Sequence, residues 1–536
     1  MRKGEGEKID DGIFDCADQR IAGPNVIILS NSGKPIFSRY GDEVDVSNTC
    51  AMLHAMLSSS ENNQIQSFKA GTLLFVVSSI DNMSLLAISN NGGETEIFLR
   101  MLLEYVYAQI VFTLTDQIHN IILSRKTSDL ISILGPPATR HLYTVLEQAN
   151  ENPGPLITAA TPVIYPLDYQ LREHASKVLQ NVGYETDGLL FAALIVGDKL
   201  VTLVQPKYRY HQLNVNDVHL ILSFVKSQPC LNENESWLPI CLPIFHSDGY
   251  IYTFTSCLHK DTGLTLMLMS TNESQEQFNT FRKAATRIKQ QLYNEKESSG
   301  LDIKILFQPI NTNKSDESIG IIPGLLIKGI TQAILPEIEE ATFQKYCTIA
   351  SCYHFLFRLD TPLPCTPLPK TKNEKKSNKN GSKVFSQCIS PPLSFPFVDS
   401  KSKQRVWNTY QRLSLRLKLG ASSIDASMHA YNTISSSGNN VDAQYMGTTE
   451  MEDMGIKSSC PAIQIIEPKP PKQGITYILD GNELFFALNG NDFVLMAVFP
   501  ATIDIRIAAA SCAKLVRQLM REDRNLFIEK PLTWRQ

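Results

Sequence analysis

Residue types that could carry chemistry are present in this chain, but not at the spacing of a common catalytic or metal site. Gly33-Lys34 comes nearest to a phosphate-binding loop, yet Pro35 follows the lysine and the upstream glycine of such a loop is missing. The ten histidines are dispersed; His211 and His219, for example, are not spaced as metal ligands on one helix face. We therefore expect no covalent catalytic step, no metal and no cofactor. An enzyme whose residues meet only in the folded chain stays an alternative.

The composition of the 536 residues is typical of a protein with several folded domains. Hydrophobic residues make up 43% and charged residues 19%, which is enough apolar material for more than one core. The net charge of −4 gives no global attraction to nucleic acid, so we expect no nucleic-acid partner. The eleven cysteines lack a CxxC pair, and the first residues are polar and acidic. We therefore expect reduced thiols, no secretory leader, and a cytoplasmic protein that contacts membranes only peripherally.

The elements that must position any site form a pattern that occurs three times. Turn signals and hydrophobic periodicity predict three α+β units, each an antiparallel sheet with helices packed on it. The first unit opens with a hairpin whose turn lies at Asn31–Lys34. The predicted divisions are a flexible tail (1–22), a first unit (23–157), a second unit (158–297), a linker or insertion (298–350), and a third unit (351–536) with disordered insertions near 366–390 and 420–471.

A predicted helix over 96–115 has apolar side chains all around its axis. Such a helix must be buried on every side, so one face can lie on its own sheet while the other needs a second cover. That cover is either another domain of this same chain or an obligate partner subunit. Met52 and Met56 on the preceding helix, with Tyr105 and Tyr107 on this one, are our candidates for a protein interface. All four could equally be core residues.

A second predicted helix, over 401–419, is basic and amphipathic. At about 100° per residue, Arg405, Arg412 and Arg416 fall on one side of its axis. The opposite side carries the apolar residues Trp407, Tyr410, Leu413 and Leu417. We expect this apolar stripe to pack on the third sheet and the arginines to face outward. The arginines are then either an ordinary solvated face or a surface that contacts anionic lipid headgroups.

Four phrases of the sequence resemble one known family. They are GKPIFSRYG at Gly33–Gly41, WLPICLPIF at Trp237–Phe245, HFLF at His354–Phe357, and NLFI with PLT at Asn525–Ile528 and Pro531–Thr533. In order, they resemble the opening hairpin, a middle-domain strand, the start of the third domain and the terminus of the Mon-one family. The resemblance covers roughly 23–297 and 475–536, and the predicted linker and insertions depart from it.

The resemblance implies an α+β fold of three longin domains, each an antiparallel sheet sandwiched by helices. It implies a heterodimer with a Ccz-one-type longin partner through the first longin domains. Their shared surface would open a Rab7-type GTPase so that GDP leaves and GTP enters, and Met52, Met56, Tyr105 and Tyr107 become candidate contacts for it. It also implies recruitment by phosphatidylinositol 3-phosphate to late endosome, vacuole or lysosome membranes, where these compartments and autophagosomes fuse. For that membrane contact our candidates are Arg405, Arg412 and Arg416.

Nucleotide exchange makes and breaks no bond, because the exchange factor only stabilises the nucleotide-free GTPase. The lack of catalytic motifs agrees with such an activity. The alternative function is a longin-domain trafficking scaffold without exchange activity, such as a subunit of a related Fuzzy-like or Hermansky–Pudlak-like heterodimer.

Overall fold

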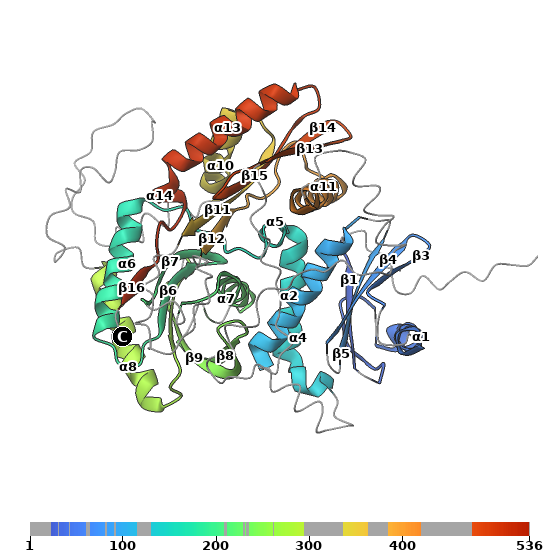
Figure 1. Ribbon diagram of the computed structural model, residues 1–536. Helices are drawn as coiled ribbons and strands as arrows, with labels where there is room; N and C mark the ends of the chain where they lie inside the picture. Colours follow the sequence, from blue (N-terminus) through green and yellow to red (C-terminus); the bar gives the residue numbers. More distant parts are fainter. Residues whose placement is uncertain are drawn as a thin grey trace, which may run out of the picture. The chain divides into compact units, whose positions relative to one another are not determined.

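The computed structural model describes residues 23–534 with gaps, and contains three β-sheets with helices packed against them (Figure 1). The positions outside the description are 1–22, 31, 42, 60–64, 81–82, 91–92, 115–129, 208–211, 229–230, 232–234, 261, 294–335, 363–383, 420–473 and 535–536. The predicted tail, most of the predicted linker and the predicted insertion at 420–471 lie there. Contacts divide the chain into two units: Met1–Ala159, His246–Gly249 and Leu393–Asn491 form unit 1, and Ala160–Phe245, Tyr250–Pro392 and Asp492–Gln536 form unit 2.

The first sheet lies in unit 1 and is antiparallel, with the strand order β2-β1-β5-β4-β3. Helix α1 packs on one face, and α2 and α4 lie on the other (Figure 1). Five of the six residues of β1 are buried because helices cover both faces of the sheet. The elements are β1 (Asn25–Ser30), β2 (Pro35–Ser38), α1 (Glu43–Ser59), β3 (Ser67–Ala70), β4 (Leu73–Ile80), β5 (Met83–Asn90), α2 (Glu96–Leu114), α4 (Leu130–Glu151) and the short α5 (Gly154–Ile157).

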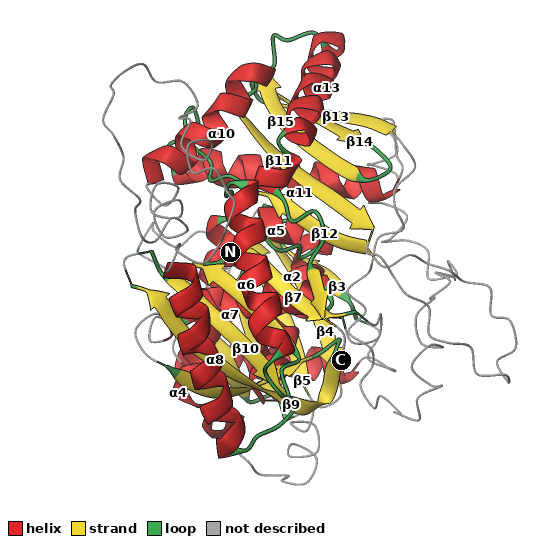
Figure 2. Cartoon of the chain, turned by 90° about the vertical axis from the view of Figure 1, so that its left-hand side faces the viewer, coloured by secondary structure: helices red, strands yellow, loops and turns green. Residues whose placement is uncertain are grey.

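The second sheet lies in unit 2 and has the order β16-β7-β6-β10-β9-β8. Helices α6 and α8 cover one face (Figure 2), and α7 lies on the other (Figure 1). The strands β7, β6, β10 and β9 pair antiparallel, whereas β16 joins β7 in parallel. The elements are α6 (Tyr169–Tyr184), β6 (Phe191–Val196), β7 (Lys199–Pro206), α7 (Val215–Ser227), β8 (Ser236–Leu242), β9 (His246–His259), β10 (Leu264–Ser270), α8 (Gln275–Tyr293) and β16 (Leu532–Trp534).

The third sheet has the order β12-β11-β15-β14-β13. In unit 2, α10 and α13 pack together beside β11 and β15; in unit 1, α11 packs on β13 and β14. The elements are α10 (Pro336–Ala350), β11 (His354–Pro362), β12 (Val384–Ile389), α11 (Ser400–Leu419), β13 (Gly474–Asp480), β14 (Glu483–Asn489), β15 (Phe493–Pro500), α13 (Ile505–Arg521) and α14 (Asp523–Leu526). Three sheets with attached helices confirm the predicted α+β class.

Three of the predicted divisions are wrong at their edges. The predicted linker ends in α10, where Phe343 and Tyr346 pack on the ring of Phe355 in β11. The predicted disordered insertion near 366–390 ends in β12, an ordered strand. The predicted third unit, 351–536, also supplies β16 to the second sheet. Each segment is ordered by contacts with residues farther away in the sequence, α10 by α13, β12 by β11 and β16 by β7, and local composition does not reveal these contacts.

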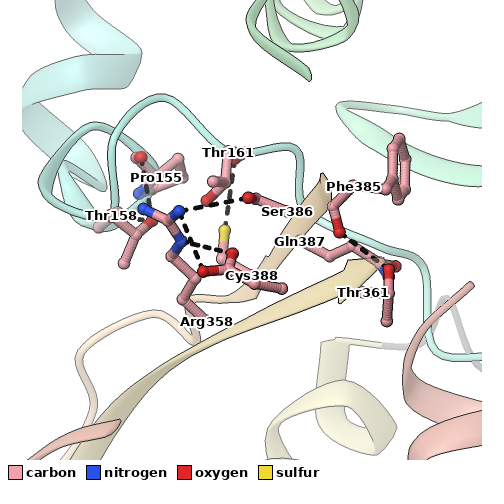
Figure 3. Close-up of polar contacts among 11 residues, drawn as sticks. Pro155, Thr158, Thr161, Arg358, Thr361, Phe385, Ser386, Gln387 and Cys388 are labelled. Carbon is pink, nitrogen blue, oxygen red and sulfur yellow. Dashed lines mark hydrogen bonds and ion pairs between the residues drawn. The ribbon is translucent and has the colours of Figure 1, made fainter. Parts of the chain in front are cut away.

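Strand β12 is hydrogen-bonded along both edges. On one edge it pairs with β11, and the Arg358 guanidinium donates to the Ser386 hydroxyl at 3.2 Å (Figure 3). On the other edge the Cys388 amide donates to the Pro162 carbonyl at 3.1 Å, and the Cys388 thiol to the Thr161 carbonyl at 3.4 Å (Figure 3). The segment at Thr161–Pro162, which precedes α6 and the second sheet, therefore covers the outer edge of β12 in the third sheet.

The end of the chain, Arg521–Trp534, forms what we call the C-terminal strap, which is anchored by Arg172 of α6. The Arg172 side chain is buried, and its guanidinium donates to four backbone carbonyls. These belong to Tyr165 (2.7 Å), Arg524 (2.6 Å), Asn525 (2.9 Å) and Phe527 (2.8 Å). Burial lowers the arginine pKa to about 10, so the side chain is still a cation near neutral pH. A single buried cation thus holds three carbonyls of the strap that lie within four residues of one another.

Two further contacts fix the rest of the C-terminal strap within unit 2. Gln387 of β12 and Ile528 exchange a pair of hydrogen bonds, both 2.8 Å, through the glutamine amide and the Ile528 backbone. Beyond them, Trp534 is buried in the core of the second sheet domain. A side chain at Gly183 of α6 would lie 2.9 Å from the Trp534 ring, so only glycine leaves room for this tryptophan.

We expect Arg172→Met to destabilise the protein severely. The substitution removes a donor from four carbonyls, of which those of Tyr165 and Phe527 are in buried contacts, and each buried group left unsatisfied costs about 1–3 kcal/mol. The Asn525 carbonyl keeps the Leu167 amide as a donor. Thermal unfolding and limited proteolysis measure the effect, and cleavage within the strap should come first. The control is Arg524→Met, since the Arg524 side chain is 61% exposed and its ion pair with Glu529 is long. Equal melting temperatures for the two variants would contradict the prediction.

Candidate functional site

The exposed face of α1 is the first candidate for a docking surface. Leu53 and Leu57 point into the core of the first sheet domain, whereas Met52 and Met56 are 58% and 41% exposed. Ala51 and Ala55 are exposed beside them, and the sequence from 47 to 60 contains no Asp, Glu, Lys or Arg. Uncharged surfaces with exposed methionines are adaptable and are enriched at protein interfaces. We call this face of α1 the α1 surface. The structure thus leaves both predicted methionines accessible.

The tip of the β1–β2 hairpin lies against the same helix. Gly33 has a positive φ of 78°, and a Cβ at this position would lie 2.7 Å from the His54 ring of α1. The Gly33 amide donates to the Ser30 carbonyl at 2.9 Å, and the Ser30 amide donates to the Lys34 carbonyl at 2.9 Å, which closes the turn. Gly33 is therefore required for two reasons, the left-handed turn and the close approach of α1. Lys34, the next residue of the turn, is exposed.

The end of the hairpin phrase is structural rather than chemical. The Ser38 hydroxyl donates to the Tyr40 carbonyl at 2.6 Å, and the Tyr40 amide donates to the Asn25 side chain at 3.3 Å. The Arg39 guanidinium donates to the Pro24 carbonyl at 3.0 Å. These bonds return the chain across the start of β1. They account for the residue types in the phrase by the geometry of the turn.

The other two interface candidates lie inside the chain. Tyr105 and Tyr107 of α2 are 5% and 1% exposed, so they offer no accessible surface in this structure. The second cover that α2 needs is provided within unit 1. It is α4 along the helix and α11 at its start, where Thr95 donates its amide to the Gln411 side chain at 3.1 Å. Helix α4 belongs to the first predicted unit and α11 to the third, so only part of this cover comes from another domain of the chain.

Among the described residues, α2 is the one helix long and apolar enough to cross a membrane by length and composition. The most apolar window of α2 is 67% buried against the rest of the chain. A helix buried to this extent has the environment of a core helix. The all-round apolar pattern is thus explained by packing in unit 1.

The contact between α2 and α4 contains a buried polar pair. A ring nitrogen of His141 lies 2.7 Å from the Gln109 side-chain oxygen, and both residues are at most 1% exposed. Burial lowers the His141 pKa to about 4, so the ring is neutral near pH 7. A neutral imidazole here joins the helices by a hydrogen bond without the cost of a buried charge.

This pair makes stability depend on pH. The folded pKa of His141 is about 4 and the unfolded value is 6.5, so between these values the unfolded chain binds the extra proton. Stability should therefore fall as pH drops from 6.5 toward 4, by about 1.4 kcal/mol per pH unit for this histidine. We expect His141→Gln to flatten that slope in urea unfolding at pH 7, 6 and 5. His246→Gln, at an exposed histidine, is the control. Parallel pH profiles for parent and His141→Gln would contradict the assignment.

The arginines of α11 lie at the edge of the helix, where Arg412 is exposed and Arg405 and Arg416 are half-buried, so the expected outward face is only partly present. Arg405 forms an ion pair with Glu483 at 2.7 Å, and Arg412 with Asp480 at 2.6 Å. Arg416 donates to the Tyr477 carbonyl at 2.9 Å. The apolar side of the helix is buried as predicted, with Tyr410 edge-on to Phe485 of β14. The arginines bind acidic and carbonyl oxygens near the β13–β14 turn, because α11 lies across these strands and long side chains reach over its edge.

We expect the Arg412–Asp480 pair to be detectable by charge reversal. Arg412→Glu places two carboxylates together and should lower stability by about 1 kcal/mol, a small effect because the Arg412 side chain is 49% exposed. Asp480→Lys in the Arg412→Glu background should restore part of the loss, and each single variant serves as the control for the double. Thermal shift measurements test this cycle. Additive losses would show that the two side chains do not interact in solution.

A depression between α2, α5 and α11 has no room for a substrate. It is lined by Thr95, Ile97, Phe98, Met101, Ile157, Gln411, Ser414 and Leu415, and its volume of about 10 Å³ holds roughly one water molecule. Mostly apolar and uncharged, its lining contains no acid or base, and the Ser414 hydroxyl donates to the Ile157 carbonyl at 3.3 Å. This site therefore gives no support to the enzymatic alternative.

Comparison with known proteins gives the context of the α1 surface. Family models match residues 24–136 as the first longin domain of FUZ, MON1 and HPS1, and residues 187–290 as the second. Protein SAND of Takifugu rubripes is 33% identical over 46% of this chain and 47% of its own length. Vacuolar fusion protein MON1 homolog A of Gallus gallus is 32% identical over 50% of this chain and 48% of its length.

Similarity extends further along the chain in other relatives. Vacuolar fusion protein MON1 of Yarrowia lipolytica is 29% identical over 61% of this chain and 60% of its own length. The chain thus spans about half the length of the first two relatives. The two longin matches coincide with the first and second sheet domains, and α1 with its exposed methionines lies in the first.

Proposed function

Because the chain belongs to the family of longin-domain proteins that includes FUZ, MON1 and HPS1, and resembles the MON1 vacuolar fusion proteins, we propose that it acts in membrane trafficking at the vacuole, late endosome or lysosome. More specifically, we propose that it is one subunit of a heterodimeric guanine nucleotide exchange factor. Its partner is a Ccz-one-type longin protein, and the pair activates a Rab7-type GTPase for fusion of these compartments and of autophagosomes. The observation that supports this best is the match of both longin models, in order, together with relatives named for vacuolar fusion.

The proposed activity needs a docking surface and no reacting groups. An exchange factor that binds the nucleotide-free GTPase more tightly than the nucleotide-bound form weakens nucleotide binding by the same factor. The α1 surface has the properties that such docking requires, since Met52 and Met56 are exposed, uncharged and held on a helix that is fixed to a sheet. We assign it to the contact with the longin partner or the GTPase.

Charge substitution on the α1 surface tests this assignment. Met52→Asp with Met56→Asp buries charge in the complex, so we expect release of fluorescently labelled GDP from a Rab7-type GTPase to slow at least tenfold, equivalent to about 1.4 kcal/mol. The melting temperature should stay close to that of the parent, since both side chains are exposed. The protein is co-expressed with its Ccz-one-type partner for this assay. The matched control is Ile507→Asp on α13, where the isoleucine is 57% exposed.

The outcomes separate the surface from the function. If the double aspartate variant accelerates GDP release like the parent, the docking surface lies elsewhere and the proposed exchange activity still stands. A parent complex that fails to accelerate GDP release would reject the exchange activity itself. Loss of activity together with a sharply lower melting temperature would show that the methionines support the fold.

A scaffold function is the second candidate, and one observation favours it. The matched longin models are shared by FUZ, MON1 and HPS1, so the domain matches alone do not distinguish exchange factors from other longin heterodimers. A scaffold would bind a longin partner and leave GDP release unchanged. Capture of the partner from cells, followed by the exchange assay, distinguishes the two.

Recruitment to membranes that contain phosphatidylinositol 3-phosphate is also part of the proposal. The ion pairs of Arg405 and Arg412 reduce the charge that α11 offers to a headgroup. The carbonyl contact of Arg416 further fixes its guanidinium at β13. We therefore expect other residues to contribute most of the lipid contact, and neutral Arg→Gln variants, which add no repulsion at Asp480 and Glu483, to measure what α11 adds.

A further inference from the structure

Helix α10 ends in a tight and well-defined cap. The Ser351 amide donates to the Thr348 carbonyl at 3.2 Å, and the Cys352 amide donates to the Cys347 carbonyl at 3.0 Å. Ser351 has a positive φ of 55°, the left-handed conformation of the residue just after a helix. These two bonds and this dihedral angle define a Schellman motif, in which the side chain after the left-handed residue folds back onto the last turn.

In this motif the two side chains that meet are both cysteines. The fold-back places the Cys352 side chain beside Cys347, five positions earlier in the chain, so that the two thiols lie within reach of a hydrogen bond. In most caps of this kind the pair is an apolar contact. Cys347 and Cys352 are largely buried, at 6% and 7% exposed, and Cys512 of α13 is fully buried beside them. The backbone itself therefore holds a pair of thiols in contact.

We propose that Cys347 and Cys352 are a dithiol site that peroxides oxidise reversibly to a disulfide. The Cys347 thiolate attacks one oxygen of hydrogen peroxide and becomes a sulfenic acid, and the hydroxide released takes up a proton to leave as water. The Cys352 sulfur then attacks the sulfenic sulfur, and its thiol proton leaves with the hydroxyl group as a second water. Two thiols and one peroxide thus give one disulfide and two waters. A dithiol reductant reverses the reaction by thiol–disulfide exchange.

The environment gives the two sulfurs different roles. The hydrogen bond from Cys352 lowers the pKa of Cys347, whereas the same bond and burial raise the pKa of Cys352. Cys347 is therefore the sulfur that reacts with peroxide, since the thiolate is the nucleophile. Burial alone raises the thiol pKa of Cys50 to about 11 and of Cys512 to about 12, which makes both poor nucleophiles.

The site lies where α10 is joined to α13 in unit 2. Lys345 and Tyr346, the residues just before the first cysteine, both bind the Glu522 carboxylate at the end of α13, the lysine at 3.0 Å. A disulfide would lock the cap of α10 directly beside this junction. Because the Schellman bonds already hold the backbone in place, closure needs only rotation of the two side chains and leaves the fold unchanged.

Peptide mapping tests the proposal on the full chain. The reduced protein is treated with hydrogen peroxide, quenched in acid, denatured, alkylated with iodoacetamide and digested with trypsin. Cys347 and Cys352 lie together in the peptide Tyr346–Arg358, which has no internal lysine or arginine. We expect this peptide to lose both alkylation sites at least about tenfold faster than Cys50 loses its own. Dithiothreitol should restore both sites.

Three variants assign the roles. Cys352→Ser should stop at a sulfenic acid on Cys347 that dimedone labels, and Cys347→Ser should leave Cys352 alkylatable. Cys512→Ser is the matched control at the neighbouring thiol and should still form the disulfide. The proposal is overturned if both cysteines stay alkylatable at doses that oxidise Cys50. A cross-link between Tyr346–Arg358 and the Cys512 peptide, Ile507–Lys514, would overturn it as well. One of the two cysteines would then form its disulfide with Cys512 and not with the other.

Discussion

The interaction on which unit 2 depends is the set of hydrogen bonds from Arg172 to the backbone of the C-terminal strap. Its four acceptors are carbonyl oxygens from Tyr165 and from three residues of the strap. Carbonyls satisfy the donors of a buried guanidinium without requiring any particular side chain in return. Arg172 therefore fixes the backbone conformation of the strap independently of the types of its side chains. Those side chains are then available to fill the core, as Leu526 and Phe527 do.

From this anchor the strap connects elements that lie far apart in the sequence. Gln387 receives and returns a hydrogen bond with Ile528, which fixes β12 to the strap. Trp534 enters the core between α6 and the second sheet, and Gln180 donates to the Thr533 carbonyl at 2.7 Å. The phrases at both ends of the chain thus owe their residue types to backbone geometry. At the start this is a left-handed glycine against α1, and at the end it is a strap held by its carbonyls.

The local part of this architecture follows from the sequence. The hairpin at Asn31–Lys34, the all-round apolar helix α2 and the buried stripe of α11 were all predictable, because turn chemistry and helical periodicity are properties of neighbouring residues. The exposure of Met52 and Met56 was open beforehand, since an apolar residue on a helix indicates a core position as readily as an interface. The longin assignment came from phrases in the right order, and the family matches confirm it for the first two sheet domains.

The remaining features depend on distant partners. The ion pairs of Arg405 and Arg412 could not be predicted from the helix alone, because Glu483 and Asp480, which supply the opposite charges, lie beyond a long intervening segment. The sequence places β12 in a predicted insertion and α10 in the predicted linker. Each lies next to a polar stretch, and the elements that bury it lie elsewhere in the sequence. The five-residue spacing of Cys347 and Cys352 only weakly indicates that the two thiols meet. Only the left-handed Ser351 brings the two sulfurs together.

The parallel pairing of β16 with β7 has a consequence for the order in which the protein can be assembled. The residues Gln180 and Thr533, which meet beside β16, are separated by 353 positions. During synthesis the end of β7 that receives β16, at Val204–Pro206, therefore presents unpaired backbone groups, and an empty space for an indole ring, until the segment that contains Trp534 has left the ribosome. An open strand edge pairs readily with other chains. The second longin domain is thus synthesised early and completed late. For that interval we expect chaperones and fast translation to limit wrong pairing at the β7 edge.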